Sequence, residues 1–447
     1  MFIEQLALDQ RQAALARQRW TERALLITAW VFLAANTLAL SISRGDFRLE
    51  AWWHLLAWTV CAIAGVWLLD KRLPRRDPLL FPLALIMTGW GIIAIERLEE
   101  RLEPIFADRQ TVWLIISVGA MLIVASLPQV LRWLRVYRYT LLVIGLALLV
   151  STILLGSNPS AQPGAPELWL GFGTVFFQPS EPLKIILVAF LASYMAEQYP
   201  ALRAEGLEAE HRLLSLSPRI LGPILLMWGL SVVFLVWQRD LGTAILIFVV
   251  FLTLLYVASG YTPLLLIGAV LVLIAGIAAY QLFAVVQLRV DIWINPWPEA
   301  SGDAYQIVQS LFAFASGGVF GQGIGQGAPN NIPVVHSDFI FAAIAEEWGL
   351  LGVIAVIGCL MTLVTRGLRS ATLQRGRPFT ALLAVGLSLL IGLQSLLIMG
   401  GVLKLIPLTG VTLPFFSYGG SSLLTNFVIL ALLLRLSSES PSPTGER

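Results

Sequence analysis

The hydrophobic positions of this chain form long apolar runs. A helix that crosses a membrane needs about 20 mostly apolar residues. Runs of this kind predict twelve spans, at residues 24–42, 51–69, 79–95, 111–127, 139–156, 183–199, 220–237, 241–258, 263–286, 339–364, 379–401 and 423–436. In the closely spaced pair 220–237 and 241–258, the alternative is that one helix is broken or re-entrant. The predicted fold is an all-α polytopic membrane bundle.

Composition agrees with a membrane protein. Hydrophobic residues make up 57% of the chain and charged residues 13%, against about 45–50% and about 25% in soluble domains. These values exclude a soluble enzyme, a nucleic-acid binder and a disordered scaffold. Cys61 and Cys359 lie in apolar runs, and His54, His211 and His336 are scattered, so neither a disulfide framework nor a zinc cluster is indicated.

Lysine and arginine positions predict the orientation. Most of the 29 basic residues fall on one side if the N-terminus lies inside, and basic loops stay in the cytoplasm. Both termini and residues 365–378 are therefore expected in the cytoplasm, and the first span should be an uncleaved anchor. The long loop 287–337, with a helix-like run from Tyr305 to Phe314, should be external. The apolar, Pro- and Gly-containing stretch 404–422 should be a re-entrant outer loop.

Ionisable side chains at membrane depth are costly and are candidates for function. Glu181 and Lys184 share one face at the start of a span, which Ser180 can cap. They fit either a structural ion pair between two helices or a pair that shapes a substrate cavity. Arg239 and Asp240 fit a solvated turn, or a cap of the next helix by Asp240, or a functional charge pair.

More acidic residues follow the long outer loop. Asp338 lies where the chain enters a span, so that Ser337 or Asp338 can cap the helix, or Asp338 can act in a site. Glu346 and Glu347 lie deeper and need partners or a wet cavity, and a structural partner inside the bundle is expected for Glu347.

The glycine run SGGVFGQGIGQG (316–327) lacks the GK[ST] ending of a nucleotide loop. It remains open as a hinge or as a set of backbone donors near an anionic group.

Six segments together resemble the SEDS family (shape, elongation, division and sporulation), which includes FtsW, RodA and SpoVE. They are QPSEPLK (178–184), RDLGTA (239–244), INPW (294–297), YQIVQSLFAFASGGVFGQGIGQG (305–327), HSDFIFAAIAEEWGLLG (336–352) and PLTGVTLPFFSYGGSS (407–422). The resemblance covers roughly 140–436. It implies a catalytic membrane core at 139–436, after an N-terminal part at 1–138 and before a cytoplasmic tail at 437–447. The chain has two spans more than the family's usual ten, at its N-terminus.

The resemblance implies a glycosyltransferase of the bacterial plasma membrane that polymerises peptidoglycan strands from lipid II with a class B penicillin-binding protein, a transpeptidase. The essential aspartate of the family's outer-loop motif corresponds to Asp338, here preceded by Ser337 in place of threonine. The glutamate–lysine pair carries over to Glu181 and Lys184. The chain departs from the family at Arg239, where proline is frequent, and at Pro166–Trp169, where a basic residue is frequent.

This activity assigns roles to further residues. The transfer needs a base near the acceptor hydroxyl and positive charge near the leaving diphosphate. Asp338 is the candidate base, and Arg289, or alternatively Lys404, is the candidate cation. Gln306 and His336 are further candidates for substrate binding, with Asp240 and Glu346 as supporting residues.

Some alternatives stay open at this point. The diphosphate is a group that Mg²⁺ or Mn²⁺ can bind, but no paired carboxylate motif requires a metal. The competing functions are a lipid II flippase and a scaffold for the transpeptidase. The sequence favours the enzyme because the polar residues of the predicted spans gather in the outer half of the membrane and in the long outer loop.

Overall fold

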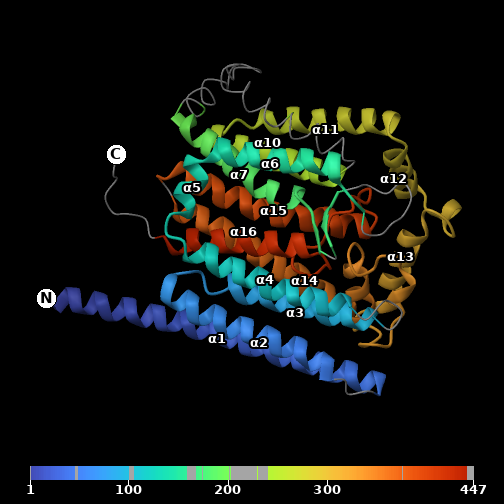
Figure 1. Ribbon diagram of the computed structural model, residues 1–447, viewed down its shortest axis with the longest axis horizontal. Coiled ribbons are helices and arrows are strands. Elements are labelled where there is room, and N and C mark those ends of the chain that lie inside the picture. Colours follow the sequence, from blue (N-terminus) through green and yellow to red (C-terminus); the bar gives the residue numbers. More distant parts are fainter. Residues whose placement is uncertain are drawn as a thin grey trace. The chain divides into compact units, whose positions relative to one another are not determined.

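The computed structural model describes residues 2–45, 49–99, 105–158, 168–173, 175–200, 240–374 and 376–439, together with residues 202 and 229. Within them the chain is almost entirely helical (Figure 1). The helices are α1 (Phe2–Arg44), α2 (Leu49–Arg72), α3 (Leu80–Leu98), α4 (Phe106–Ser126), α5 (Val130–Val136), α6 (Arg138–Leu155), α7 (Ser180–Glu197), α10 (Leu241–Ser259), α11 (Pro263–Leu282), α12 (Ala284–Ile294), α13 (Tyr305–Gly317), α14 (Ile340–Leu373), α15 (Pro378–Val402) and α16 (Gly420–Ser438). A short antiparallel hairpin of β1 (Leu170–Phe172) and β2 (Val175–Phe177) pairs Leu170 with Phe177. The all-α class predicted from the sequence is confirmed.

Ten helices of the described residues are long and apolar enough to cross a membrane: α1–α4, α6, α10, α11 and α14–α16. Ten of the twelve predicted spans coincide with them. The predicted span 183–199 is the helix α7, which falls outside this set because Glu181, Lys184 and Glu197 make it too charged. The predicted span 220–237 lies outside the described residues.

The described chain divides into two compact units. Unit 1 comprises residues 1–128, 309–373 and 412–444, and unit 2 comprises residues 129–308, 374–411 and 445–447. In unit 1, α1 packs on α3, α2 packs on α4, and α16 packs on α4, α3 and α14. In unit 2, α7 packs on α15, α6 and α10. The two units are described separately below.

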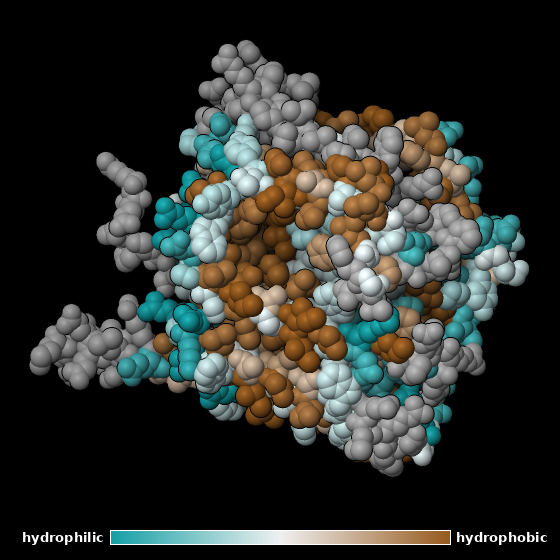
Figure 2. Space-filling model, viewed as in Figure 1, coloured by the Kyte–Doolittle hydropathy of each residue, from teal (hydrophilic) through white to brown (hydrophobic). Residues whose placement is uncertain are grey.

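In unit 1 the interior is apolar and tightly packed, and the phenylalanines at 81, 339, 341, 416 and 427 are fully buried. Gly91 of α3 permits one close approach, because a Cβ there would lie 2.4 Å from the backbone oxygen of Phe416. In the lower part of Figure 2, over α1–α4, hydrophobic residues gather in the middle and hydrophilic residues at the left end. This is the surface of a helical bundle surrounded by lipid.

The loops agree in part with their predictions. A helix was expected from Tyr305 to Phe314, and α13 is present there. The helix α12, just before it, was not predicted. The part of the stretch 404–422 that belongs to unit 1 is non-helical from 412 to 419, and Leu413, Phe415 and Phe416 in it are buried. Its backbone therefore lies inside the protein, where non-helical structure is tolerated.

Candidate active site

The candidate base, Asp338, lies in a turn that immediately precedes α14. The backbone N–H groups of Ser337 and Asp338 donate to the carbonyl oxygen of Val334, at 3.2 and 3.3 Å. The Ser337 hydroxyl donates to Oδ1 of Asp338 at 3.1 Å, and the Asp338 side chain is half-buried. Because α14 begins at Ile340, the residue that flanks the helix is Phe339. Capping of α14 by Ser337 or Asp338 stays a prediction.

A second motif, far away in the sequence, holds this turn in place. The Tyr418 N–H donates to the carbonyl oxygen of His336 at 2.8 Å. The Ser417 hydroxyl donates to the carbonyl oxygen of Ser337 and accepts from the N–H of Leu413 at 2.9 Å. The PFFSYGG motif thus holds the main chain of the two residues that directly precede Asp338.

Gln110 of α4 holds the second motif in turn. Its side chain is 1% exposed. Its Nε2 donates to the carbonyl oxygen of Ser417 at 3.1 Å, and its Oε1 accepts from the N–H of Gly419 at 3.2 Å. The sequence analysis missed Gln110, an amide directly before the predicted span 111–127. Gln110 therefore fixes the backbone that fixes the Asp338 turn.

The His336 ring packs against two aromatic rings, with centroids 4.7 Å from Phe106 and 5.5 Å from Tyr418, and these two rings also contact each other. Burial lowers the pKa of His336 from 6.5 to about 4, so the ring is neutral at pH 7. Burial raises the pKa of Tyr418, and a hydrogen bond and the positive charge of Arg109 oppose that rise. Arg109, an exposed cation at the start of α4, is thus near the turn and was also missed.

The deeper acids Glu346 and Glu347 are both bound inside unit 1. Glu347 forms an ion pair with Arg97 of α3 at 2.8 Å, with side chains 1% and 5% exposed. Its Oε1 also accepts from the N–H of Gly325 at 3.2 Å, and Oε1 of Glu346 accepts from the N–H of Ala328 at 2.9 Å. The expected structural partner of Glu347 is confirmed. In the glycine run 316–327 the N–H of Gly325 thus donates to one of the protein's own carboxylates, and Ala328, which donates to the other, directly follows the run.

The same run pairs with a break in α14. Gly349 has φ 66° and ψ −162°, which interrupts the helical hydrogen bonds. The N–H groups of Leu350 and Leu351 donate instead to the carbonyl oxygens of Gly318 and Val319, at 3.0 and 3.2 Å. A Cβ at Gly349 would lie 2.3 Å from the backbone nitrogen of Gly321. Only glycine tolerates both this left-handed φ and the close approach of the Gly321 backbone.

In unit 2 the predicted Glu181–Lys184 pair is present. The Lys184 Nζ lies 2.9 Å from Oε1 of Glu181 and donates at 2.9 Å to Oε1 of Gln394, on α15. All three side chains are buried. The pair therefore links α7 to α15, and Gln394 is a member that the sequence did not indicate. Pro179, not Ser180, flanks α7.

The other predicted residues of unit 2 contact the backbone. Arg289 donates to the carbonyl oxygen of Thr409 at 3.3 Å, and Lys404 donates to that of Ile294 at 3.4 Å. Gln306 lies half-buried in the first turn of α13.

Asp240 caps α10, because its Oδ1 accepts from the N–H of Thr243 at 3.1 Å. Its sequence neighbour Arg239 lies outside the described residues.

The predicted residues thus form two sets. Asp338, His336 and Glu346 belong to unit 1. The others belong to unit 2: Arg289, Lys404, Gln306, Glu181, Lys184 and Asp240. Among the described residues, no group of three or more His, Cys, Asp or Glu side chains could hold a metal ion. No step below depends on a metal ion.

Comparison with known proteins gives consistent matches. The family model FTSW_RODA_SPOVE, described as a cell cycle protein, matches residues 78–442. Peptidoglycan glycosyltransferase RodA of Mycobacterium tuberculosis is 38% identical over 384 residues, which cover 84% of this chain and 80% of that protein. A probable peptidoglycan glycosyltransferase FtsW of Geobacter metallireducens is 30% identical over 382 residues, which cover 82% and 96%.

Solved structures show the same fold. A chain from a peptidoglycan synthase complex that coordinates polymerization and crosslinking matches with a TM-score of 0.66 and 26% identity, over 81% of this chain and 97% of that one. Rod shape determining protein RodA of Thermus thermophilus matches with a TM-score of 0.57 and 24% identity, over 81% and 96%.

Proposed function

The chain belongs to the FtsW/RodA/SpoVE family of peptidoglycan glycosyltransferases, and we propose that it polymerises lipid II into glycan strands at the outer face of the plasma membrane, for cell elongation or division. The observation that carries the proposal is the Asp338 turn, whose backbone at His336 and Ser337 is held by the PFFSYGG motif. Its half-buried carboxylate can meet a substrate and is positioned by part-buried hydrogen bonds. The family assignment favours the enzyme over the flippase and the scaffold.

The proposed step is a single displacement. The 4-hydroxyl of one sugar attacks the anomeric carbon of another, and its proton passes to the Asp338 carboxylate. The new carbon–oxygen bond forms while the bond to the lipid diphosphate breaks, and the diphosphate leaves with the electron pair. A positioned general base typically contributes about 10²–10⁴-fold to the rate.

The leaving diphosphate needs positive charge near it. Arg109 belongs to the same unit as Asp338 and lies beside Tyr418, so we add it to the predicted cations Arg289 and Lys404. Binding of the diphosphate by these cations stays a prediction. So do substrate binding by Gln306 and His336, cavity shaping by Glu181 and Lys184, and the supporting roles of Asp240 and Glu346.

Two substitutions at Asp338 test the proposal. Asp338→Asn keeps the size of the side chain but cannot take a proton, so glycan synthesis from purified lipid II should fall by about 10²–10⁴-fold while the melting temperature stays near wild type. Asp108→Asn, the same change at an exposed carboxylate of unit 1, is the matched control and should retain activity. A purely structural role predicts the opposite, with normal turnover for Asp338→Asn and destabilisation for Asp338→Ala. Full activity of a folded Asp338→Asn protein would refute the assignment.

The partner and the orientation are also proposals. We infer a class B penicillin-binding protein as partner, since a similar chain was solved in a peptidoglycan synthase complex. Co-purification of that transpeptidase should raise polymerisation; no effect and no association would contradict the inference.

For the orientation, a cysteine at exposed Thr372 should be shielded from impermeant reagents applied outside. One at exposed Ser301 should react. The reverse labelling pattern would overturn the predicted topology.

A further inference from the structure

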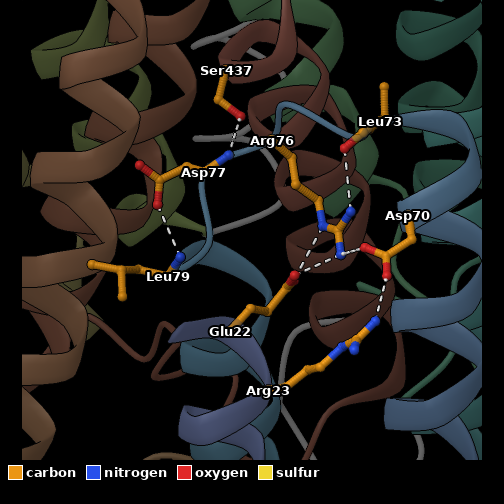
Figure 3. Close-up of polar contacts among 8 residues, drawn as sticks. All are labelled: Glu22, Arg23, Asp70, Leu73, Arg76, Asp77, Leu79 and Ser437. Carbon is orange, nitrogen blue, oxygen red and sulfur yellow. Dashed lines mark hydrogen bonds and ion pairs between the residues drawn. The ribbon is translucent and has the colours of Figure 1, made fainter. Parts of the chain in front are cut away.

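The helices α1 and α2 precede the segment that matches the family model, and a buried charge network joins the C-terminal end of α2 to the middle of α1. The side chain of Arg76, 3% exposed, donates to both carboxylate oxygens of Glu22 at 3.1 and 2.6 Å. It also donates to Oδ1 of Asp70 at 2.9 Å (Figure 3). Since Glu22 belongs to α1 and Asp70 to the last turn of α2, the buried guanidinium fixes the middle of α1 to the end of α2.

A second arginine completes the network from outside. Arg23 donates through Nη2 to Oδ2 of Asp70 at 3.2 Å, but its side chain is 58% exposed (Figure 3). A guanidinium carries five N–H donors, and this contact uses one of them. The two carboxylates and two guanidiniums balance in charge. Among the described residues of these segments of α1 and α2, exposed Arg17, Arg19, Lys71 and Arg72 are then surplus positive charge.

An exposed apolar face of α2 lies directly next to these cations. On α2, Leu56, Val60, Ile63 and Trp67 are 57–65% exposed at intervals of three and four residues, which places them on one side of the helix. The next position on that side is Lys71, whose Nζ lies 3.5 Å from the centroid of the Trp67 ring.

The neighbouring helix repeats the arrangement. On α1, Ile27 and Val31 are 65% and 55% exposed, and Trp20, near Arg23, is 73% exposed. The Trp30 indole donates to the hydroxyl of Thr59 on α2 at 3.1 Å, which keeps the two helices together on this side. Each helix therefore has an exposed apolar stripe that ends in a tryptophan and a cation.

We propose that this face of α1–α2 binds an anionic phospholipid. Arg23 and Lys71 bind the phosphate, and the acyl chains lie along Ile27 and Ile63. Basic residues next to membrane helices attract anionic headgroups, and tryptophans prefer the headgroup level. An acidic soluble peptide would use the cations but would leave the two apolar stripes uncovered, so a ligand with both a phosphate and hydrocarbon chains fits better. With the predicted orientation, the site faces the inner leaflet.

The test measures lipid retention, not polymerisation, so it stands apart from the proposed function. The purified full chain is incubated with equal amounts of phosphatidylglycerol and phosphatidylcholine, and the lipids that it retains are counted by native mass spectrometry. One basic residue near an anionic surface is worth about fivefold in binding. The wild type should therefore prefer phosphatidylglycerol by about tenfold or more. The double variant Arg23→Gln/Lys71→Gln should lose most of this preference.

Controls separate lipid recognition from general charge and from folding. Arg369→Gln removes an exposed cation of α14 in the same unit and should retain the preference, as should Lys71→Arg. Should the double variant misfold, the single Lys71→Gln, which disturbs no ion pair, should lose about fivefold. The proposal is overturned by a folded variant with unchanged preference, by an equal loss in Arg369→Gln, or by displacement of phosphatidylglycerol with polyglutamate.

Discussion

Gln110 offers the sharpest test of how the fold positions the proposed base. Gln110→Ala removes the donor to the Ser417 carbonyl oxygen, a buried contact, and the acceptor for the Gly419 N–H, a part-buried contact. Each backbone group left without a partner costs about 1–3 kcal/mol, so the substitution should cost about 2–6 kcal/mol in total. Part of this cost should appear as lower stability and part as a displaced Asp338 turn.

The catalytic consequence follows from the chain of contacts. Ser417 donates to the carbonyl oxygen of Ser337, so a shift of its backbone moves the turn that carries Asp338. A misplacement of about 1 Å typically costs about 10²-fold in rate. In the lipid II polymerisation assay, Gln110→Ala should lower kcat by about 10–100-fold with little change in KM. The shape of the pH–rate profile should persist, because the base itself remains.

The controls decide between positioning and simple loss of stability. Ser117→Ala changes a buried polar residue of the same helix and should leave kcat near wild type. In a double-mutant cycle, Gln110→Ala and Ser417→Ala should be non-additive in kcat, because they interrupt one chain of hydrogen bonds. A folded Gln110→Ala protein with wild-type kcat would refute the reasoning. Additive effects would show that Gln110 does not act through Ser417.

Three further predictions concern charges. Glu347→Gln leaves Arg97 buried without its counter-ion and should lower the free energy of unfolding in detergent by about 3–5 kcal/mol. The apolar double variant Arg97→Met/Glu347→Leu should restore most of that stability, and a loss below about 1 kcal/mol in Glu347→Gln would contradict the burial argument. Glu181→Ala should destabilise the protein by a similar amount, and by more than the charge exchange Glu181→Lys/Lys184→Glu. Equal melting temperatures for the wild type and these two variants would mean that the pair is not buried in the native bundle. Since the pKa of His336 is lowered to about 4 in the folded state, the unfolded state binds its proton first. The free energy of unfolding should then fall by up to about 3 kcal/mol as the pH drops from 6.5 to 4, and it should not change through this group above pH 6.5. His336→Gln should reduce this pH dependence of stability, and an unchanged pH dependence would exclude the histidine as its cause.

The sequence by itself determined the membrane character and most of the helices. Apolar runs of sufficient length have no soluble alternative, and backbone groups in lipid must bond within a helix. Charges in such runs are costly, so Glu181, Lys184 and Glu347 could be recognised as needing partners without any structure. The pairing of Glu181 with Lys184 was also accessible, because three residues along a helix is a local spacing. The division into 1–138, 139–436 and 437–447 stays a prediction.

Only the tertiary structure decided which distant groups meet. Arg97 is 250 residues from Glu347, and Gln110 is 307 residues from Ser417. No local period encodes such pairs, because they depend on which helices pack together and at what height. The break of α14 at Gly349 likewise depends on the approach of Gly321, a residue of another segment. Sequence could thus name Asp338 as a candidate, but the frame that holds it arises from packing between distant segments.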